Sequence, residues 1–468
     1  MSKYYVNTPI YYVNDVPHVG HFYTTLAADV LARYYALKIG KENVLFVTGT
    51  DEHGAKVAQA AEAHGKTPQE YADEVAPTFQ KAWDEAGLSY DYFMRTTHPE
   101  HKRIAQEILQ KMYDAQYIYK GVYEGLYCVG CEKFLTEQDI VDGKCPLHPN
   151  QEPVHQKEDN YFFKLKDFAA QVRAKIASGE IEVLPESRRN EVLGRIDQGV
   201  EDISISRQGL SWGVQIPWDN TQTVYVWVEA LFNYYTATKI IPGKEDFWPN
   251  QLQLMAKDIV WFHAFIWPAL LLAAGLGLPK TVFAHGFFTI NGQKMSKSLG
   301  NVIAPSELIE KYGRDGARYL LLSAYTFGND GDLALDKFTD TYNSDLANGL
   351  GNLISRTAKL CEGLDMGEHK AKEFSFHYIE RIESYAFYEV LDDIWKKLAE
   401  LDKYFNHTEP WKLKGTPEAL KEALSPVVQG LLDIAMELEP FMPETAGKIK
   451  EQFSGSEIKA GEPYFMRI

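Results

Sequence analysis

Lys3-Tyr-Tyr-Val-Asn-Thr-Pro-Ile-Tyr-Tyr-Val13 opens the stretch of sequence that decides the fold. Its β-branched and aromatic residues predict a strand, and the turn at 14–17 ends it. From His18 to about Lys38, apolar residues recur at helical spacing, and the run at 44–47 predicts a second, buried strand. A further helix follows, so the order strand, helix, strand, helix indicates an α/β fold with a doubly wound, Rossmann-like parallel sheet.

Polar turns follow both predicted strands, at Asn14–His21 and at Thr48–Gly54. In doubly wound sheets, ligands bind beyond the carboxyl ends of the strands. We therefore expect a binding site where these two turns meet.

Changes in composition along the chain predict how it is divided. Short strands, turns and a Cys cluster fill 117–217 without a long helical repeat, which indicates an inserted domain. The α/β pattern returns at Thr223, and the chain is mainly helical from about Ser306. The predicted ranges are the first half of the sheet domain at 1–112, the insert at 113–217, the second half at 218–305, a linking segment at 306–335 and a C-terminal α-helical bundle at 336–468. Within the bundle, helices are expected at 339–361, 375–405, 417–438 and 440–452.

Composition excludes several classes of protein. The 468 residues carry a net charge of −17, so any contact with nucleic acid must be local, and four Cys cannot form a disulfide scaffold. The first residues lack the apolar block of a signal peptide. The uncharged stretch Ile259–Leu278 is interrupted by His263, Pro268 and two Gly, which favours a buried helix over a membrane span.

Cys128-Val-Gly-Cys131 and Cys145-Pro-Leu-His148 show the spacing of a zinc knuckle. Two ligands separated by two residues can reach one tetrahedral ion, and the second pair completes its coordination. Because no position is left for water, we expect one structural Zn²⁺ rather than a catalytic ion. Ordinary buried thiols are the alternative for the three Cys of this pattern, and the isolated Cys361 is expected in the core.

Two short motifs suit a nucleotide triphosphate. His18-Val-Gly-His21 opens the first helix, whose N-terminus favours anions. Lys294-Met-Ser-Lys-Ser298 puts two ammonium groups and two hydroxyls after a turn, as a phosphate clamp requires. Taken alone, each motif also has a purely structural interpretation. The first could simply begin a helix, and the second could be a solvated basic loop.

In combination, the two motifs resemble the HIGH and KMSKS signatures of class I aminoacyl-tRNA synthetases. Four further stretches resemble the methionyl-tRNA synthetases of that class, and the knuckle matches their bacterial single-knuckle type. The stretches are Thr8–Tyr12, Thr48–Gly54, Tyr225–Ala230 and Lys257–His263. The resemblance implies a ligase that joins L-methionine to tRNA(Met), initiator and elongator, through a methionyl-adenylate.

The resemblance also assigns the groups that handle ATP. His18 and His21 would stabilise the phosphates in the transition state, and Lys297, assisted by Lys294, would hold the departing pyrophosphate. Asp258 would contact the ribose, Ser296 would join the ATP site, and Mg²⁺ would accompany the phosphates. Positioned cations and N–H donors suit the spread negative charge of both reaction steps.

By the same resemblance, Asp51 would bind the methionine ammonium with the help of the Ile10 carbonyl, a charge-assisted hydrogen bond. Aromatic walls suit a thioether, and Tyr12 and His263 are expected to offer hydrogens to its sulfur. Core packing is the alternative for each aromatic. The expected side-chain pocket consists of Tyr12, Trp227, Ala230, Leu231, Tyr234, Ile259, His263 and Trp267. Two residues depart from the pattern of the resembled family: Ala256 stands where Gly is usual, and Glu229 stands where Asp is usual. Because neither change removes a catalytic charge, we expect them to affect only the fine geometry of the site.

The helical end would read the CAU anticodon. In the family, the positions of Asn348, Asn352, Arg356, Pro410 and Trp411 do so, and amide or aromatic side chains can bond or stack with unpaired bases. A solvated helix face and a core Trp are the alternatives. Because the chain is acidic, phosphates would meet a narrow basic strip made of Arg356, Lys359, Lys412 and Lys414.

Three other classes of protein fit the sequence less well. Class I enzymes for Leu, Ile or Val need a large editing domain, which 113–217 is too short to hold. A cysteinyl enzyme would place a metal in its amino-acid pocket, and a non-catalytic relative would lose signature residues. Many members of the resembled family carry a C-terminal dimerisation module, and the given sequence ends at Phe465–Ile468, so we expect a monomer. We also expect it to act in the cytoplasm and not to contact a membrane.

Overall fold

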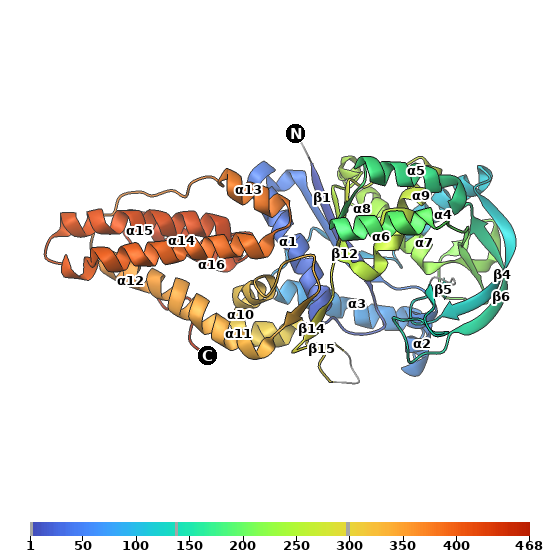
Figure 1. Ribbon diagram of the computed structural model, residues 1–468, viewed down its shortest axis with the longest axis horizontal. Helices are drawn as coiled ribbons and strands as arrows, with labels where there is room; N and C mark the ends of the chain where they lie inside the picture. Colours follow the sequence, from blue (N-terminus) through green and yellow to red (C-terminus); the bar gives the residue numbers. More distant parts are fainter. Residues whose placement is uncertain (1–2, 136–138, 296–299) are drawn as a thin grey trace. The chain divides into compact units, whose positions relative to one another are not determined.

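The computed structural model describes residues 3–135, 139–295 and 300–468, which form two compact units (Figure 1). The first unit comprises Met1–Pro17, Ile39–Asp84 and Ser89–His285, and the second comprises His18–Lys38, Glu85–Leu88 and Gly286–Ile468. The five ranges expected from the sequence stay a prediction.

A six-stranded sheet forms the centre of the first unit, and every neighbouring pair of its strands is parallel. This confirms the doubly wound parallel sheet. In spatial order the strands are β3 (Tyr92–Arg95), β2 (Val44–Asp51), β1 (Tyr4–Tyr12), β12 (Leu252–Ala256), β13 (Thr281–His285) and β7 (Glu182–Leu184).

The strand order reverses next to β1, the point at which doubly wound sheets bind their ligands. The chain continues from β1 to β2 and β3 on one side, whereas β12 pairs with the opposite side of β1. At the carboxyl end, Tyr12 pairs with Asp51, and β12 stops at Ala256. The two polar turns predicted to hold the site therefore begin near the switch point of the sheet.

Helices surround this sheet, and their apolar residues form a core with it that includes Phe163, Phe232 and Trp267. Figure 1 shows the labels of α4 to α9 close together, in the part of the chain coloured from light blue through green to yellow-green. The helices of this unit are α2 (Ala55–Ala63), α3 (Pro68–Glu85), α4 (Pro99–Asp114), α5 (Leu165–Ser178), α6 (Glu186–Asp197), α7 (Val226–Leu231), α8 (Asn233–Ile240) and α9 (Trp267–Ala274). Short 3-10 turns lie at Lys41–Asn43 and Glu245–Phe247.

The expectation that 117–217 lacks a long helix is wrong. This range contains α5 and α6, and β7 between them joins the central sheet. Leu165, Phe168, Val172 and Ile176 are buried on one face of α5, a helical spacing that the sequence already carried. The segment folds this way because that face packs into the core of the main sheet.

Antiparallel strands fill much of the rest of the predicted insert, and a strand that begins at Asp219, just after it, pairs with two of them. β4 pairs with β6 from Ile118 opposite Phe163 to Tyr127 opposite Val154. The four-stranded sheet contains β5 (Lys133–Leu135), β4 (Ile118–Cys128), β6 (Val154–Phe163) and β8 (Ile203–Ser204), and a three-stranded sheet contains β10 (Gln215–Ile216), β11 (Asp219–Val224) and β9 (Ser206–Gln208).

The uncharged stretch after β12 is buried, as expected, but it is not one regular helix. A 3-10 turn at Lys257–Ile259 leads into a π-helical segment at Phe262–Ile266, and α9 follows. Within the described ranges, no helix combines the length and apolarity needed to cross a membrane.

The second unit is mainly helical, as the sequence predicts for the end of the chain. In Figure 1, α14, α15 and α16 lie side by side in the orange and red part. The helices are α1 (Val19–Ile39), α10 (Pro305–Leu322), α11 (Leu335–Thr341), α12 (Asn352–Cys361), α13 (Phe376–Glu383), α14 (Phe387–Thr408), α15 (Pro417–Leu438) and α16 (Pro443–Phe453). A small sheet contains β15 (Gln293–Lys294), β14 (Phe288–Ile290) and β16 (Gly331–Leu333).

Two of the expected bundle helices are interrupted. The range 339–361 passes through a π-helical segment at Tyr342–Gly351 before α12 begins. The range 375–405 is two helices, because Tyr385 between them has a φ of 64°, which breaks a right-handed helix. The helix expected at 417–438 is α15.

Candidate active site and metal centre

The expected methionine-pocket residues come together in the first unit. Tyr12 ends β1 beside Asp51, and its ring lies edge-on to Trp227, with centroids 6.1 Å apart. Tyr234 contacts both His263 and Trp267. Ala230 and Leu231 are buried on α7, Ile259 packs against the same core, and Ile10 lies on β1 opposite Gly49. Helix α7, helix α8 and the segment after β12 thus surround the switch point.

Asp51 is a buried carboxylate with spare binding capacity. Its side chain is 3% exposed, and Oδ1 has no hydrogen-bond partner among the described residues. Burial and the nearby charge of Glu229 raise the pKa of Asp51 well above its ordinary value, against the effect of the His53 backbone N–H. A substrate ammonium would supply both the missing partner and the missing positive charge.

The contacts of His263 differ from the hydrogen donation to sulfur that the sequence predicts. Its Nδ1 lies 3.0 Å from the Ile259 carbonyl, which can only accept, so Nδ1 carries a hydrogen. Burial lowers the pKa of His263 to about 4, so the ring is neutral and Nε2 accepts from the Tyr234 hydroxyl at 2.7 Å. In this arrangement His263 has no hydrogen left for a thioether sulfur.

Tyr12 keeps its hydroxyl available. Its Oη is buried and has no hydrogen-bond partner in the part of the chain that the structure describes. Burial, followed by the charge of Asp51, raises the pKa of Tyr12 well above its ordinary value, so the hydroxyl keeps its hydrogen. Of the two donors expected to face the sulfur, Tyr12 is the one that the geometry leaves able to donate.

Glu229 organises a buried network that the sequence did not predict. His53 Nδ1 lies 2.7 Å from one carboxylate oxygen, and His101 Nε2 lies 2.8 Å from the other. Contact with the two imidazoles lowers the pKa of Glu229 to about 2, against the opposing effect of burial. His101 also contacts Thr236 at 2.8 Å. No sequence signal joined His53 to His101, because their elements are distant in the chain.

The departure at Ala256 is sterically mild. Its φ of −79° and ψ of 156° are extended angles that any residue adopts, so the backbone does not require Gly there. Asp258 follows in the exposed 3-10 turn at the end of β12. Asp258 therefore lies at the carboxyl edge of the sheet, and its contact with the ribose stays a prediction.

The first signature, in the second unit, is a compact pair of imidazoles. The His18 and His21 rings stack with centroids 3.7 Å apart. The backbone N–H of Gly20 donates to His18 Nδ1 at 3.1 Å, and a Cβ on Gly20 would lie 2.9 Å from that ring. Gly20 therefore permits the stack, and the Nε2 atom of a neutral His18 carries the hydrogen.

The second signature is described only in part. Lys294 ends the hairpin strand β15, which follows a turn at Asn291 and Gly292, both with positive φ. Ser296 and Lys297 lie outside the described residues. Their roles stay predictions.

The knuckle residues form a candidate metal centre. Ligand atoms of Cys128, Cys131, Cys145 and His148 all lie within 4.8 Å of one another. Cys131 Sγ is 3.5 Å from Cys145 Sγ and 3.2 Å from His148 Nδ1. Ligands at about 2.3 Å from a tetrahedral ion are about 3.8 Å apart, so the spacing and the three-sulfur, one-nitrogen set fit zinc. A Cβ on Gly130 would lie 2.5 Å from the His148 ring, so only Gly fits there.

Of the expected anticodon residues, the structure brings Arg356 and Trp411 into contact in the second unit. Asn348 and Asn352 are exposed, and Trp411 is 38% exposed, which is more than a core Trp shows. The Arg356 guanidinium lies 5.6 Å from the Trp411 ring centroid and 4.5 Å from that of Phe405. Pro410 and Trp411 begin a 3-10 turn, Pro410–Lys412, after α14.

The expected basic strip is interleaved with acids. Lys359 pairs with Glu362 at 2.6 Å, and Lys412 pairs with Glu409 at 2.7 Å. Exposed pairs of this kind are weak and exchange readily, so the cations stay accessible to phosphate.

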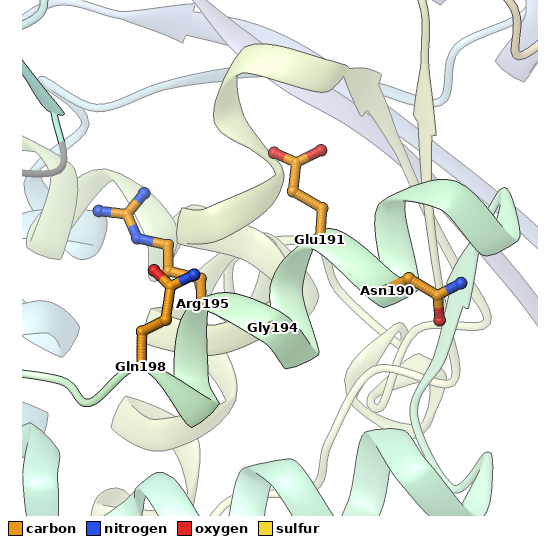
Figure 2. Close-up of a pocket in the computed structure, with 5 residues that line it drawn as sticks. All are labelled: Asn190, Glu191, Gly194, Arg195 and Gln198. Carbon is orange, nitrogen blue, oxygen red and sulfur yellow. The ribbon is translucent and has the colours of Figure 1, made fainter. Parts of the chain in front are cut away.

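A separate cavity of about 400 Å³ lies along α6. Figure 2 shows its polar side chains pointing in different directions, with Arg195 and Gln198 at one end and Asn190 at the other. None of the site residues expected from the sequence lines it.

Comparison with known proteins agrees with this geometry. The family described as tRNA synthetases class I (M) matches residues 4–152 and 148–358. The methionine--tRNA ligase of Thermotoga maritima is 40% identical over 100% of this chain and 80% of its own length. That of Fusobacterium nucleatum is 42% identical over 96% of this chain and 74% of its own length.

Solved structures lead to the same family. Mycobacterium tuberculosis methionyl-tRNA synthetase in complex with methionyl-adenylate matches with a TM-score of 0.92 and 35% identity, covering 100% of both chains. The apo form of the same enzyme matches with a TM-score of 0.84 and 30% identity, over 100% of this chain and 98% of its own. This chain belongs to the methionine--tRNA ligase family of class I tRNA synthetases.

Proposed function

We propose that this chain attaches L-methionine to tRNA(Met) with ATP, as a methionine--tRNA ligase. Membership of the family supports the reaction. The buried Asp51, whose Oδ1 is unpaired among the described residues and which lies beside the aromatic pocket, is the observation that supports methionine as the substrate. The methionine carboxylate attacks the α-phosphorus of ATP, and pyrophosphate leaves. The terminal ribose hydroxyl of tRNA then attacks the carbonyl of methionyl-adenylate, and AMP leaves.

The proposed roles follow from the groups described above. Asp51 and the Ile10 carbonyl hold the ammonium, and Tyr12 donates to the sulfur. His18, His21, Lys294 and Lys297 act on the phosphates, with Asp258 at the ribose and Ser296 nearby. Mg²⁺ bound to the ATP phosphates would neutralise part of their charge. Both tRNA(Met) species, initiator and elongator, are the proposed acceptors.

For the knuckle we propose one structural Zn²⁺, held by three thiolates and the His148 Nδ1. The closed donor set supports a structural role, since no position remains for a substrate. Because every proposed methionine contact comes from one copy of the chain, the proposal takes a monomer as the acting unit, in the cytoplasm, where translation supplies its partners.

Methionine-dependent exchange of pyrophosphate into ATP tests the proposed function. The protein should catalyse exchange with methionine and not with leucine, because leucine has no sulfur to accept from Tyr12. Equal exchange rates with the two amino acids would overturn the pocket assignment. The same assay with each of the common amino acids serves as the control.

Replacing Trp411 by Ala should separate tRNA recognition from adenylate formation. A stacking platform contributes about 1–3 kcal/mol per base, so aminoacylation efficiency should fall by about 5- to 150-fold. Pyrophosphate exchange should persist, because Trp411 contacts Phe405 and Arg356 of the second unit rather than any predicted methionine residue. A parallel loss of both activities would identify Trp411 as a structural residue.

A further inference from the structure

Glu132 is a charged residue in an unusual position. It follows the knuckle residue Cys131, it is only 1% exposed, and its φ is 50°. A side chain other than Gly is strained in the left-handed region. Contacts of the carboxylate must therefore offset both the conformation and the loss of water.

Both carboxylate oxygens of Glu132 are occupied by donors. The backbone N–H of Lys56, in the first turn of α2, donates to Oε1. The hydroxyl of Tyr127 donates to Oε2. The Arg207 guanidinium lies 4.1 Å from the Tyr127 ring centroid and keeps that ring in place.

The Lys56 contact acts on the segment that presents Asp51. Only four residues separate Asp51 from Lys56, and Gly54 between them has a φ of 99°. A Cβ on Gly54 would lie 3.1 Å from Glu132 Oε1, closer than a Cβ ordinarily approaches. Gly54 thus lets the Glu132 carboxylate hold the start of α2 against the turn that follows Asp51.

The neighbouring residue contacts the opposite wall of the pocket. The Trp227 indole N–H donates to the Cys131 carbonyl at 3.2 Å. Trp227 in turn lies edge-on to Tyr12, whose ring also carries the Lys56 ammonium at 5.2 Å from its centroid. Two consecutive residues of the knuckle therefore hold the ammonium side and the aromatic side of one pocket.

We propose that Glu132 is a positioning residue for methionine, which fixes the Asp51 turn relative to Trp227 by holding the Lys56 N–H and the Tyr127 hydroxyl. The inference rests on the proposed function. Glu132 itself touches no reacting atom, so its loss should weaken methionine binding and leave ATP binding unchanged.

Three variants test this role by comparing methionine affinity with ATP affinity. Glu132→Gln keeps the size, but its one acceptor oxygen serves one donor and its amide hydrogens face the other. Methionine Kd should rise by about tenfold or more, and the KM for ATP should not change. Tyr127→Phe removes one donor and should raise methionine Kd by about threefold to tenfold.

Tyr225→Phe is the matched control, because the buried Tyr225 hydroxyl has no hydrogen-bond partner among the described residues. Its removal should leave methionine Kd unchanged. Calorimetric titration supplies Kd, and elemental analysis should find one zinc per chain in every variant.

Two outcomes would overturn the proposal. The first is that Glu132→Gln and Tyr127→Phe both bind methionine with the Kd of the parent protein. The second is that the methionine Kd and the KM for ATP rise equally and the zinc is lost. If Glu132→Gln fails to fold, Tyr127→Phe still decides. Absence of methionine-dependent exchange in the parent would instead reject the proposed function, which keeps the two failures distinct.

Discussion

Asp51→Asn is expected to lose methionine binding and, at the same time, to make the free protein more stable. Breaking a buried, hydrogen-bonded charge pair costs about 2–5 kcal/mol, so methionine Kd should rise by roughly 30-fold to several thousand-fold. The Asn amide offers one neutral acceptor where the ammonium needs a negative charge. ATP binding should change little, because Asp51 is assigned only to the amino acid.

The gain in stability has a definite pH dependence. Burial and Glu229 raise the folded-state pKa of Asp51, so the carboxyl favours unfolding once pH exceeds its ordinary, unfolded value. Below that value the carboxyl is protonated in both states and costs nothing. The free energy of unfolding of Asp51→Asn should therefore exceed that of the parent more at about pH 8 than at about pH 4.

Urea denaturation at the two pH values and methionine titration measure these two effects. Asp246→Asn makes the same chemical change at a side chain that is 86% exposed, and it should alter neither quantity. If Asp51→Asn binds methionine as tightly as the parent, Asp51 does not bind the methionine ammonium. A variant that is less stable at both pH values would show that the carboxylate serves the fold instead.

The sequence predicts the central sheet well because its information is local. A few neighbouring residues are enough to predict each element: the alternating β-branched residues predict β1, the apolar run predicts β2, and polar residues predict the turns after them. The knuckle is local in the same sense, since two pairs of closely spaced ligands define it. Some of the expected pocket residues end or follow strands of the parallel sheet, whereas those from Trp227 to Tyr234 follow β11, a strand of the antiparallel sheet.

What the sequence did not reveal depends on contacts between distant elements. The Tyr234 hydroxyl reaches the Nε2 atom of His263 from another element, and no spacing predicts that contact. Glu229, His53 and His101 lie on α7, after β2 and on α4, so only folding brings them together. The contact of Glu132 with the Lys56 N–H of α2 likewise joins elements that are distant in the chain. The π-helical segment at Phe262–Ile266 was also missed, because its apolar pattern is compatible with a regular helix.

The largest effect on rate is expected from Lys297→Ala. Lys297 belongs to the motif that resembles KMSKS and lies outside the described residues, so its role rests on the motif. The described residues on either side include Gly292 with a φ of 76° and Gly300 with a φ of 63°, positions that can absorb a backbone rotation. The Lys297 ammonium would then reach the phosphates mainly in the transition state.

Such a contact lowers the barrier without adding to ground-state binding. One well-placed electrostatic donor contributes about 10²–10³ in rate, so single-turnover adenylate formation by Lys297→Ala should slow by that factor while ATP and methionine affinities stay parental. Lys297→Arg should rescue only part of the rate, because a planar fork differs from a compact ammonium. Lys448→Ala, at an exposed residue of α16, is the matched control and should leave the rate unchanged. Adenylate formation at the parental rate in Lys297→Ala would mean that the loop is a solvated basic turn, and the transition state would then need another cation.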